Sequence, residues 1–123
     1  MTAEVWNELR ALAQLGEEDA EQWFGLCRAC GAKIQARLRD GIDSDQVGPL
    51  LWRAAGGLAF YEYSLILTAR GEAGAFAAGD LKLSHSQQTG LRAAEEVRNA
   101  RLAEAAPLLR DDQFLFCGVK ANG

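Results

Sequence analysis

Residues 47–70, VGPLLWRAAGGLAFYEYSLILTAR, are the stretch that decides the fold. Apolar side chains occur almost all round a helix drawn through this stretch, from Leu50 to Leu67. A helix that is apolar on every side is normally buried on several sides. Pro49 fits its opening turn, where no backbone N–H donor is needed. We therefore expect a central helix with other elements packed around it.

Two adjacent glycines, Gly56 and Gly57, lie in the middle of this central helix. Together they cost about 2 kcal/mol of helix propensity relative to two alanines. Glycine is favoured where another backbone comes close, because it has no side chain to obstruct the approach. We expect a neighbouring helix to cross the central helix at these glycines.

Three further stretches have helical patterns, over residues 2–15, 17–39 and 84–110. The second opens with three acidic residues, which complement the helix dipole, and continues as an apolar stripe. The stretch 84–110 has a mostly alanine apolar face, so this helix should pack at close range. Between the second and the central helix, residues 43–46 (Asp-Ser-Asp-Gln) provide candidate helix caps. The pattern predicts a mainly α domain of four helices.

Two segments look like strands rather than helices. Residues 76–84 alternate from Asp80 onward, with Leu81 and Leu83 on one side and polar residues on the other, whereas residues 114–119 are apolar on both faces. A two-stranded ribbon alone is marginal in water, so this one should lie on the helices or pair with another copy. The prediction is one domain over residues 1–123, with a β arm at about 75–84 and a C-terminal strand at about 114–119.

Composition limits the possible classes of function. With 123 residues, 49% of them hydrophobic, the chain suits one compact domain. The net charge is −4 and no block of basic residues stands out, which disfavours a surface that follows nucleic-acid phosphates. The longest apolar-leaning run is shorter than the roughly 20 residues needed to span a bilayer. The first 15 residues lack a signal-peptide pattern and the three cysteines are an odd number, so we expect a reducing cytoplasmic compartment.

The spacing Cys27-x-x-Cys30 is the only one of a metal or redox type. On a helix the two thiols share one face, which here points toward the core. A zinc site needs about four ligands, and Cys117 and His85 are the only other sulfur or nitrogen candidates. We interpret the pair as core cysteines; a redox or metal role is the alternative.

The remaining candidates for chemistry have simpler interpretations. His85 is expected at the surface near a helix start, and Glu62 is expected to pair with an arginine such as Arg92, Arg98 or Arg101. Neither has an obvious partner for acid–base catalysis. We therefore expect no enzyme, and no catalytic, cofactor-binding or metal-binding residues.

The tryptophans occur one in each of the first three helices, at Trp6, Trp23 and Trp52. Tryptophans in this arrangement either share a core or form a partner-binding surface. Both interpretations stay open on the sequence.

The order of elements carries a resemblance over nearly the whole chain. An acidic turn with a helix to residue 39, a long helix over 47–70, the segment 76–84 leading into a helix, and the terminal segment 114–119 follow one another. This layout resembles the small head–tail connector proteins of long-tailed bacteriophages and prophages. The resemblance implies a non-enzymatic structural adaptor that forms a ring on the portal protein at the virion head–tail junction. It also implies neighbouring junction proteins as partners, passive contact with DNA in the lumen, no membrane, and the bacterial host cytoplasm as the location before assembly.

The resemblance also implies where subunits meet, because the region that follows the long helix, here 47–70, takes part in subunit packing in that family. In a ring, one patch of each subunit contacts a different patch of the next. The candidate interface residues are Phe76, Asp80, Leu81, Leu83, Phe114, Phe116 and Val119. The alternative function is a small cytosolic helical module that binds a protein or peptide through the tryptophan surface.

Overall fold

The computed structural model describes residues 1–70 and 85–110. The helices are α1 (Thr2–Ala13), α2 (Ala20–Gln35), α3 (Gly48–Ala69) and α4 (His85–Ala105), with single 3-10 turns η1 (Glu17–Asp19) before α2 and η2 (Ala106–Leu108) after α4. The predicted mainly α class with four helices is confirmed. Both predicted strands lie outside the described residues, and no strand forms within the ranges that the structure describes.

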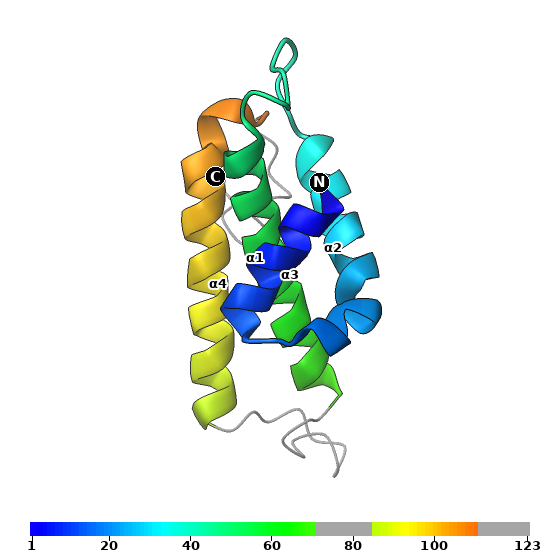
Figure 1. The fold of residues 1–123 in the computed structure, drawn as a ribbon. Helices are drawn as coiled ribbons and strands as arrows, with labels where there is room; N and C mark the ends of the chain where they lie inside the picture. Colours follow the sequence, from blue (N-terminus) through cyan, green and yellow to red (C-terminus); the bar gives the residue numbers. More distant parts are fainter. Residues whose placement is uncertain (71–84, 111–123) are drawn as a thin grey trace.

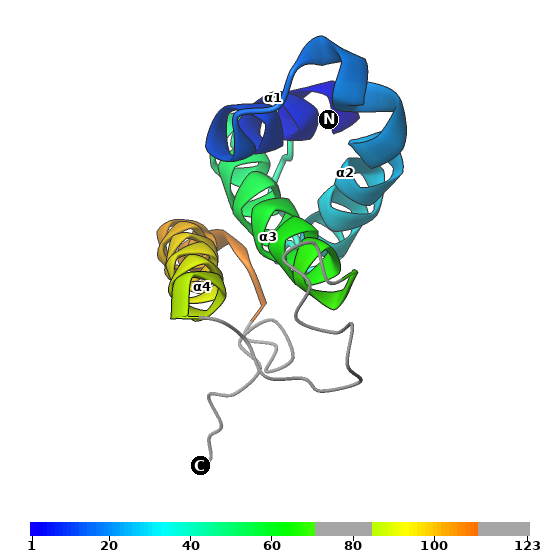
Figure 2. The same cartoon turned by 90° about the horizontal axis from the view of Figure 1, so that it is seen from below.

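Helix α3 is the centre of the bundle, as predicted. Helices α1, α2 and α4 all pack against it, and α1 also packs against α2. Viewed along the bundle, α1 and α2 cover one side of α3 while α4 lies on the other side (Figure 2). Helices α2 and α4 run in the same direction, opposite to α3 (Figure 1).

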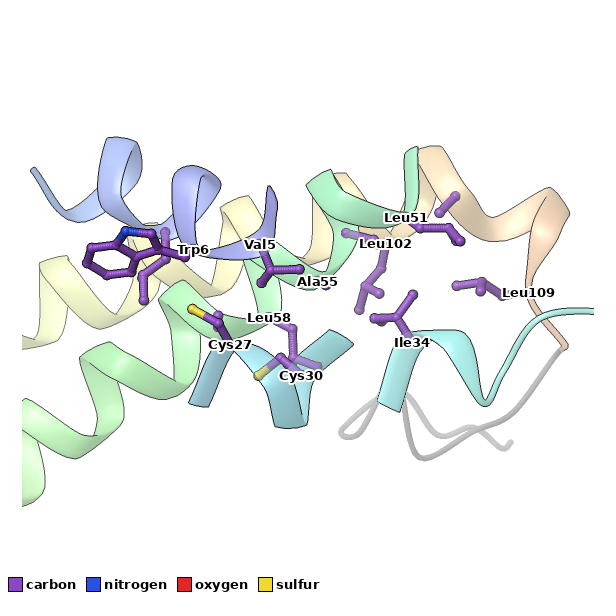
Figure 3. Close-up of a cluster of buried hydrophobic side chains, with 14 of the residues drawn as sticks. Val5, Trp6, Cys27, Cys30, Ile34, Leu51, Ala55, Leu58, Leu102 and Leu109 are labelled. Carbon is purple, nitrogen blue, oxygen red and sulfur yellow. The ribbon is translucent and has the colours of Figure 1, made fainter. Parts of the chain in front are cut away.

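The hydrophobic core is one cluster, to which all four helices and Leu109 after η2 contribute side chains. Its buried members are Val5, Trp6, Leu9, Trp23, Cys27, Cys30, Ile34, Leu51, Ala54, Ala55, Leu58, Ala59, Leu102, Ala105 and Leu109. Figure 3 shows Val5, Trp6 and Cys27 at one end, and Leu102 and Leu109 at the other. Each large side chain buried in this way stabilises the fold by about 1.5–3 kcal/mol.

The two glycines of α3 lie where its neighbours come close to it, so the predicted crossing is confirmed. A methyl group added at Gly56 would lie less than 3.0 Å from the Glu8 Cβ of α1. One added at Gly57 would lie 3.3 Å from the Arg101 Cβ and 3.4 Å from the Arg98 Cα of α4. Two helices, α1 and α4, therefore approach α3 closely where the glycines have no side chain; the sequence predicted one.

An ion pair joins the three helices at this crossing. The Arg101 Nη1 lies 2.7 Å from the Glu8 Oε1 and also donates a hydrogen bond of 3.2 Å to the Arg53 carbonyl oxygen. The Arg101 side chain is only 13% exposed, so this pair is screened less by solvent than a surface pair. The contact connects α1, α3 and α4 where side chains at the glycines would have separated them.

Helix α2 ends at Gln35, four residues before the predicted end at Arg39. Leu38 instead forms an antiparallel bridge with Leu109. The Arg39 amide donates to the Leu108 carbonyl at 2.9 Å, and the Arg110 amide donates to the Arg37 carbonyl at 2.7 Å. These non-local hydrogen bonds compete with the last turn of the helix and tie the chain after η2 to the end of α2.

Other helix boundaries also differ from prediction. Helix α1 ends at Ala13, with Gln14 in the left-handed conformation at φ 58° as its cap. The cap predicted for α3 within residues 43–46 is wrong, because the N-cap is Val47 and makes no side-chain hydrogen bond. The Asp43 carboxylate accepts a hydrogen bond from the Asp45 amide instead, which stabilises a turn within the loop.

Candidate functional site

The C-terminal half of α3 carries an apolar surface that the bundle buries only in part. None of residues 60–69 is buried, whereas residues 54–59 all are. The large apolar members are Phe60, Tyr61, Tyr63, Leu65, Ile66 and Leu67. We call residues 60–67 the apolar end of α3. Burial is less complete in this half of the central helix than in residues 54–59: Phe60, Tyr63, Ile66 and Leu67 pack against the core while partly buried, and Leu65 is 39% exposed.

Aromatic contacts hold the apolar end in place on both neighbouring helices. The Tyr63 ring packs edge-on against Trp23 of α2, with the ring centroids 4.7 Å apart. On the other side, the Arg98 guanidinium of α4 lies 4.3 Å from the centroid of the Tyr61 ring. The apolar end is therefore a supported surface of the bundle, with its aromatic rings fixed from α2 and α4.

Arg98 is a residue that the sequence reasoning missed. The apolar face expected for α4 was mostly alanine, but Ala100 is exposed and Arg98 is only 5% exposed. Its guanidinium donates to the Asn99 Oδ1 at 3.0 Å and 2.8 Å, which satisfies part of its hydrogen-bonding capacity. The signal was present, because position 98 lies one helical turn from both Ala94 and Leu102.

Glu62 forms an ion pair with a lysine rather than with the predicted arginine. The Lys33 Nζ of α2 donates to the Glu62 Oε2 at 2.9 Å. This hydrogen bond raises the pKa of Lys33 above its ordinary value. The pair joins α2 to α3 beside the apolar end and gives Glu62 a structural role.

Cys27 and Cys30 are free, buried thiols in the core, as predicted. Burial raises the pKa of Cys27 to about 11 and raises the pKa of Cys30 as well. Because the thiolate is the reactive form, both thiols are protonated and unreactive near neutral pH.

This protonation predicts slow alkylation of both cysteines. At pH 8, we expect iodoacetamide to modify Cys27 and Cys30 at least about 100-fold more slowly in the folded protein than in 6 M guanidinium, because the raised pKa removes thiolate and the core excludes the reagent. Mass spectrometry of the peptides measures each cysteine separately. Native rates close to the unfolded rates would place the thiols outside the core.

The three tryptophans do not form one surface. Trp6 and Trp23 are each 5% exposed and belong to the core, whereas Trp52 is half-buried with its ring against Gly48. A hollow of about 420 Å³ beside that ring is lined by Met1, Glu4, Gln35, Ser44, Asp45, Gly48, Leu51 and Trp52. The polar side chains of its lining are Gln35, Ser44 and the carboxylates of Glu4 and Asp45.

Residues 1–70 and 85–110 contain neither a candidate metal-binding cluster nor a candidate membrane-spanning helix. Within these ranges, no three histidine, cysteine, aspartate or glutamate side chains come together where they could hold a metal ion. None of the helices described there is both long and apolar enough to cross a membrane. His85 is the first residue of α4.

The seven predicted interface residues all lie outside the described residues: Phe76, Asp80, Leu81, Leu83, Phe114, Phe116 and Val119. The structure does describe the residues from which those segments depart. Arg70 and His85 flank the first segment at one end of the bundle, and Arg110 precedes the second near the opposite end (Figure 1). The apolar end of α3 leads directly into the first of these segments.

Comparison with known proteins found no match to this chain among protein-family models, curated proteins or solved structures.

Proposed function

We propose that this chain is a non-enzymatic structural adaptor of a phage or prophage head–tail junction, which assembles as a ring on the portal protein. The observation that carries the proposal is the apolar end of α3, a supported apolar surface that the bundle leaves partly open. Apolar surface of this kind marks contacts with other proteins. The order of elements along the chain, which resembles head–tail connectors, supplies the identity of those partners.

Several other properties suit such an adaptor. A ring needs two different patches on each subunit, and the segments 76–83 and 114–119 are the proposed strands for one set of contacts. The net charge of −4 would repel the DNA that passes through the lumen and so discourage tight binding to it. Before assembly, the protein would reside in the cytoplasm of the bacterial host.

Leu65 offers a direct test, because Leu50 is a matched control on the same helix. The two leucines are 39% and 37% exposed, respectively, and lie near opposite ends of α3. We expect Leu65→Glu to abolish assembly, because it places a charge in the apolar contact, and Leu50→Glu to leave assembly unchanged. Light scattering and electron microscopy of the full chain, alone and with the portal protein of the same genome, measure the result.

The proposal requires the unmodified protein to form rings in at least one of those two conditions. A strict monomer over the whole concentration range, with and without the portal protein, would contradict it. Equal loss of assembly in both leucine variants would instead remove the apolar end of α3 as the contact surface. Circular dichroism of each variant confirms that the helices are retained.

A further inference from the structure

Helices α2 and α4 present their outward faces on different sides of the bundle. Each packs on α3, and they run in the same direction (Figures 1 and 2). On α2, the exposed residues Glu21, Arg28 and Ala32 lie opposite the buried Cys27. Within the described part of the chain, no other element covers this face.

The outward face of α4 has a similar composition. Its exposed residues include Arg92, Glu96 and Ala103, on the side of the helix opposite Arg98. Small side chains on two facing helices allow the helix axes to approach at the short end of the usual 8–10 Å range. The two faces could therefore pack closely against each other in a pair of copies.

The charges on these two faces are not neutralised by any residue among 1–70 and 85–110. Charged residues at the helix crossings are paired, as in Arg53 with Glu104. In contrast, Glu21 and Arg28 of α2 make no ion pair with any residue in the described part of the chain. The same holds for Arg92 and Glu96 of α4 within that part of the chain.

The order of the signs is complementary between the two helices. Along α2 the negative Glu21 precedes the positive Arg28, whereas along α4 the positive Arg92 precedes the negative Glu96. Parallel packing therefore places opposite charges side by side. Antiparallel packing, as a two-fold axis across the helices would give, places like charges together, and this arrangement is disfavoured.

We propose that α2 of one copy packs in parallel against α4 of the next copy, with Glu21 facing Arg92 and Arg28 reaching Glu96. The register that aligns Glu21 with Arg92 also aligns the small residues Ala32 and Ala103. A rotation axis parallel to the bundle preserves helix direction. Repeating this contact around such an axis joins each copy to its two neighbours through two different faces, as in a ring. The inference rests on the proposed ring and adds a second contact to it, formed by described helices.

Charge reversal tests this contact. We expect Glu21→Arg and Arg92→Glu, each alone, to raise the protein concentration needed for half-assembly by about tenfold, which corresponds to about 1.4 kcal/mol. The double variant Glu21→Arg/Arg92→Glu should restore assembly to within about twofold of the unmodified protein, because it re-forms the pair with the signs exchanged. Asp40→Arg is the control, since Asp40 is exposed in the loop after α2 and lies on neither face.

Light scattering over a concentration series gives the half-assembly point for each variant. Single reversals without effect, or a double variant that stays as impaired as the singles, would overturn the α2–α4 contact while leaving the ring proposal intact. An unmodified protein that never assembles, alone or with the portal protein, would overturn both. Thermal unfolding of each variant separates loss of contact from loss of fold.

Discussion

Replacing Gly56 with alanine is expected to lower the free energy of unfolding by about 1–3 kcal/mol, although alanine is the better helix former by about 1 kcal/mol. The added methyl group would lie less than 3.0 Å from the Glu8 Cβ. That atom is attached directly to the backbone of α1, so it cannot move aside without shifting the helix. The overpacking should therefore exceed the gain in helix propensity.

Gly90→Ala is the matched control for this substitution. Gly90 lies inside α4, is exposed, and has nothing within 4 Å of the position of an added Cβ. There the same change should raise the free energy of unfolding by up to about 1 kcal/mol. Urea denaturation of both variants measures the two effects, and a shift of the same sign and size in both would show that the helices do not cross at Gly56 as closely as described.

This crossing is also the clearest case in which the sequence predicted tertiary structure. The apolar residues all round α3 predicted a central helix, and the glycine pair predicted where its neighbours approach, because both signals reside in one continuous segment. The sequence did not indicate that α1 and α4 share the crossing, or that Arg101 and Glu8 pair over Gly56. Those facts depend on which helices become neighbours, and helical periodicity does not specify this.

The predicted end of α2 and the predicted partner of Glu62 are both wrong for one physical reason, which is competition from residues distant in sequence. The pattern of α2 continues to Leu38, yet that residue pairs with Leu109. Glu62 has three arginines of α4 as plausible partners, but its position around α3 brings it to Lys33 of α2. In each case the local pattern is compatible with both outcomes, and the packing of another element decides between them.

The candidate interface illustrates a further limit of sequence patterns. The apolar residues of α3 predict burial along its whole length, but a pattern does not show how far the neighbouring helices extend over it. Only the structure shows that full burial ends after Ala59 and that the apolar residues from Phe60 onward are partly buried. The sequence-based interface residues lie outside the described ranges and stay a prediction.

Leu109→Ala is expected to lower the free energy of unfolding by about 2–4 kcal/mol, the usual range for a large apolar side chain removed from a core. Leu109 is 2% exposed and belongs to the core cluster with Ile34 and Leu51. It also places the backbone that bridges to Leu38. The substitution should therefore loosen both the core and the link between the chain after η2 and the end of α2.

Hydrogen exchange distinguishes the bridge from the rest of the bundle. The amides of Arg39 and Arg110 donate the two bridging hydrogen bonds, so in Leu109→Ala they should exchange faster than the amides in the middle of α3. Pro107→Ala is the control, because it retains the carbonyl that accepts from the Arg39 Nε and lies at an exposed position. If exchange at Arg39 and Arg110 instead rose only in parallel with exchange at the centre of α3, the bridge would open only by global unfolding. That result would contradict the expected local loosening of the link between the chain after η2 and the end of α2.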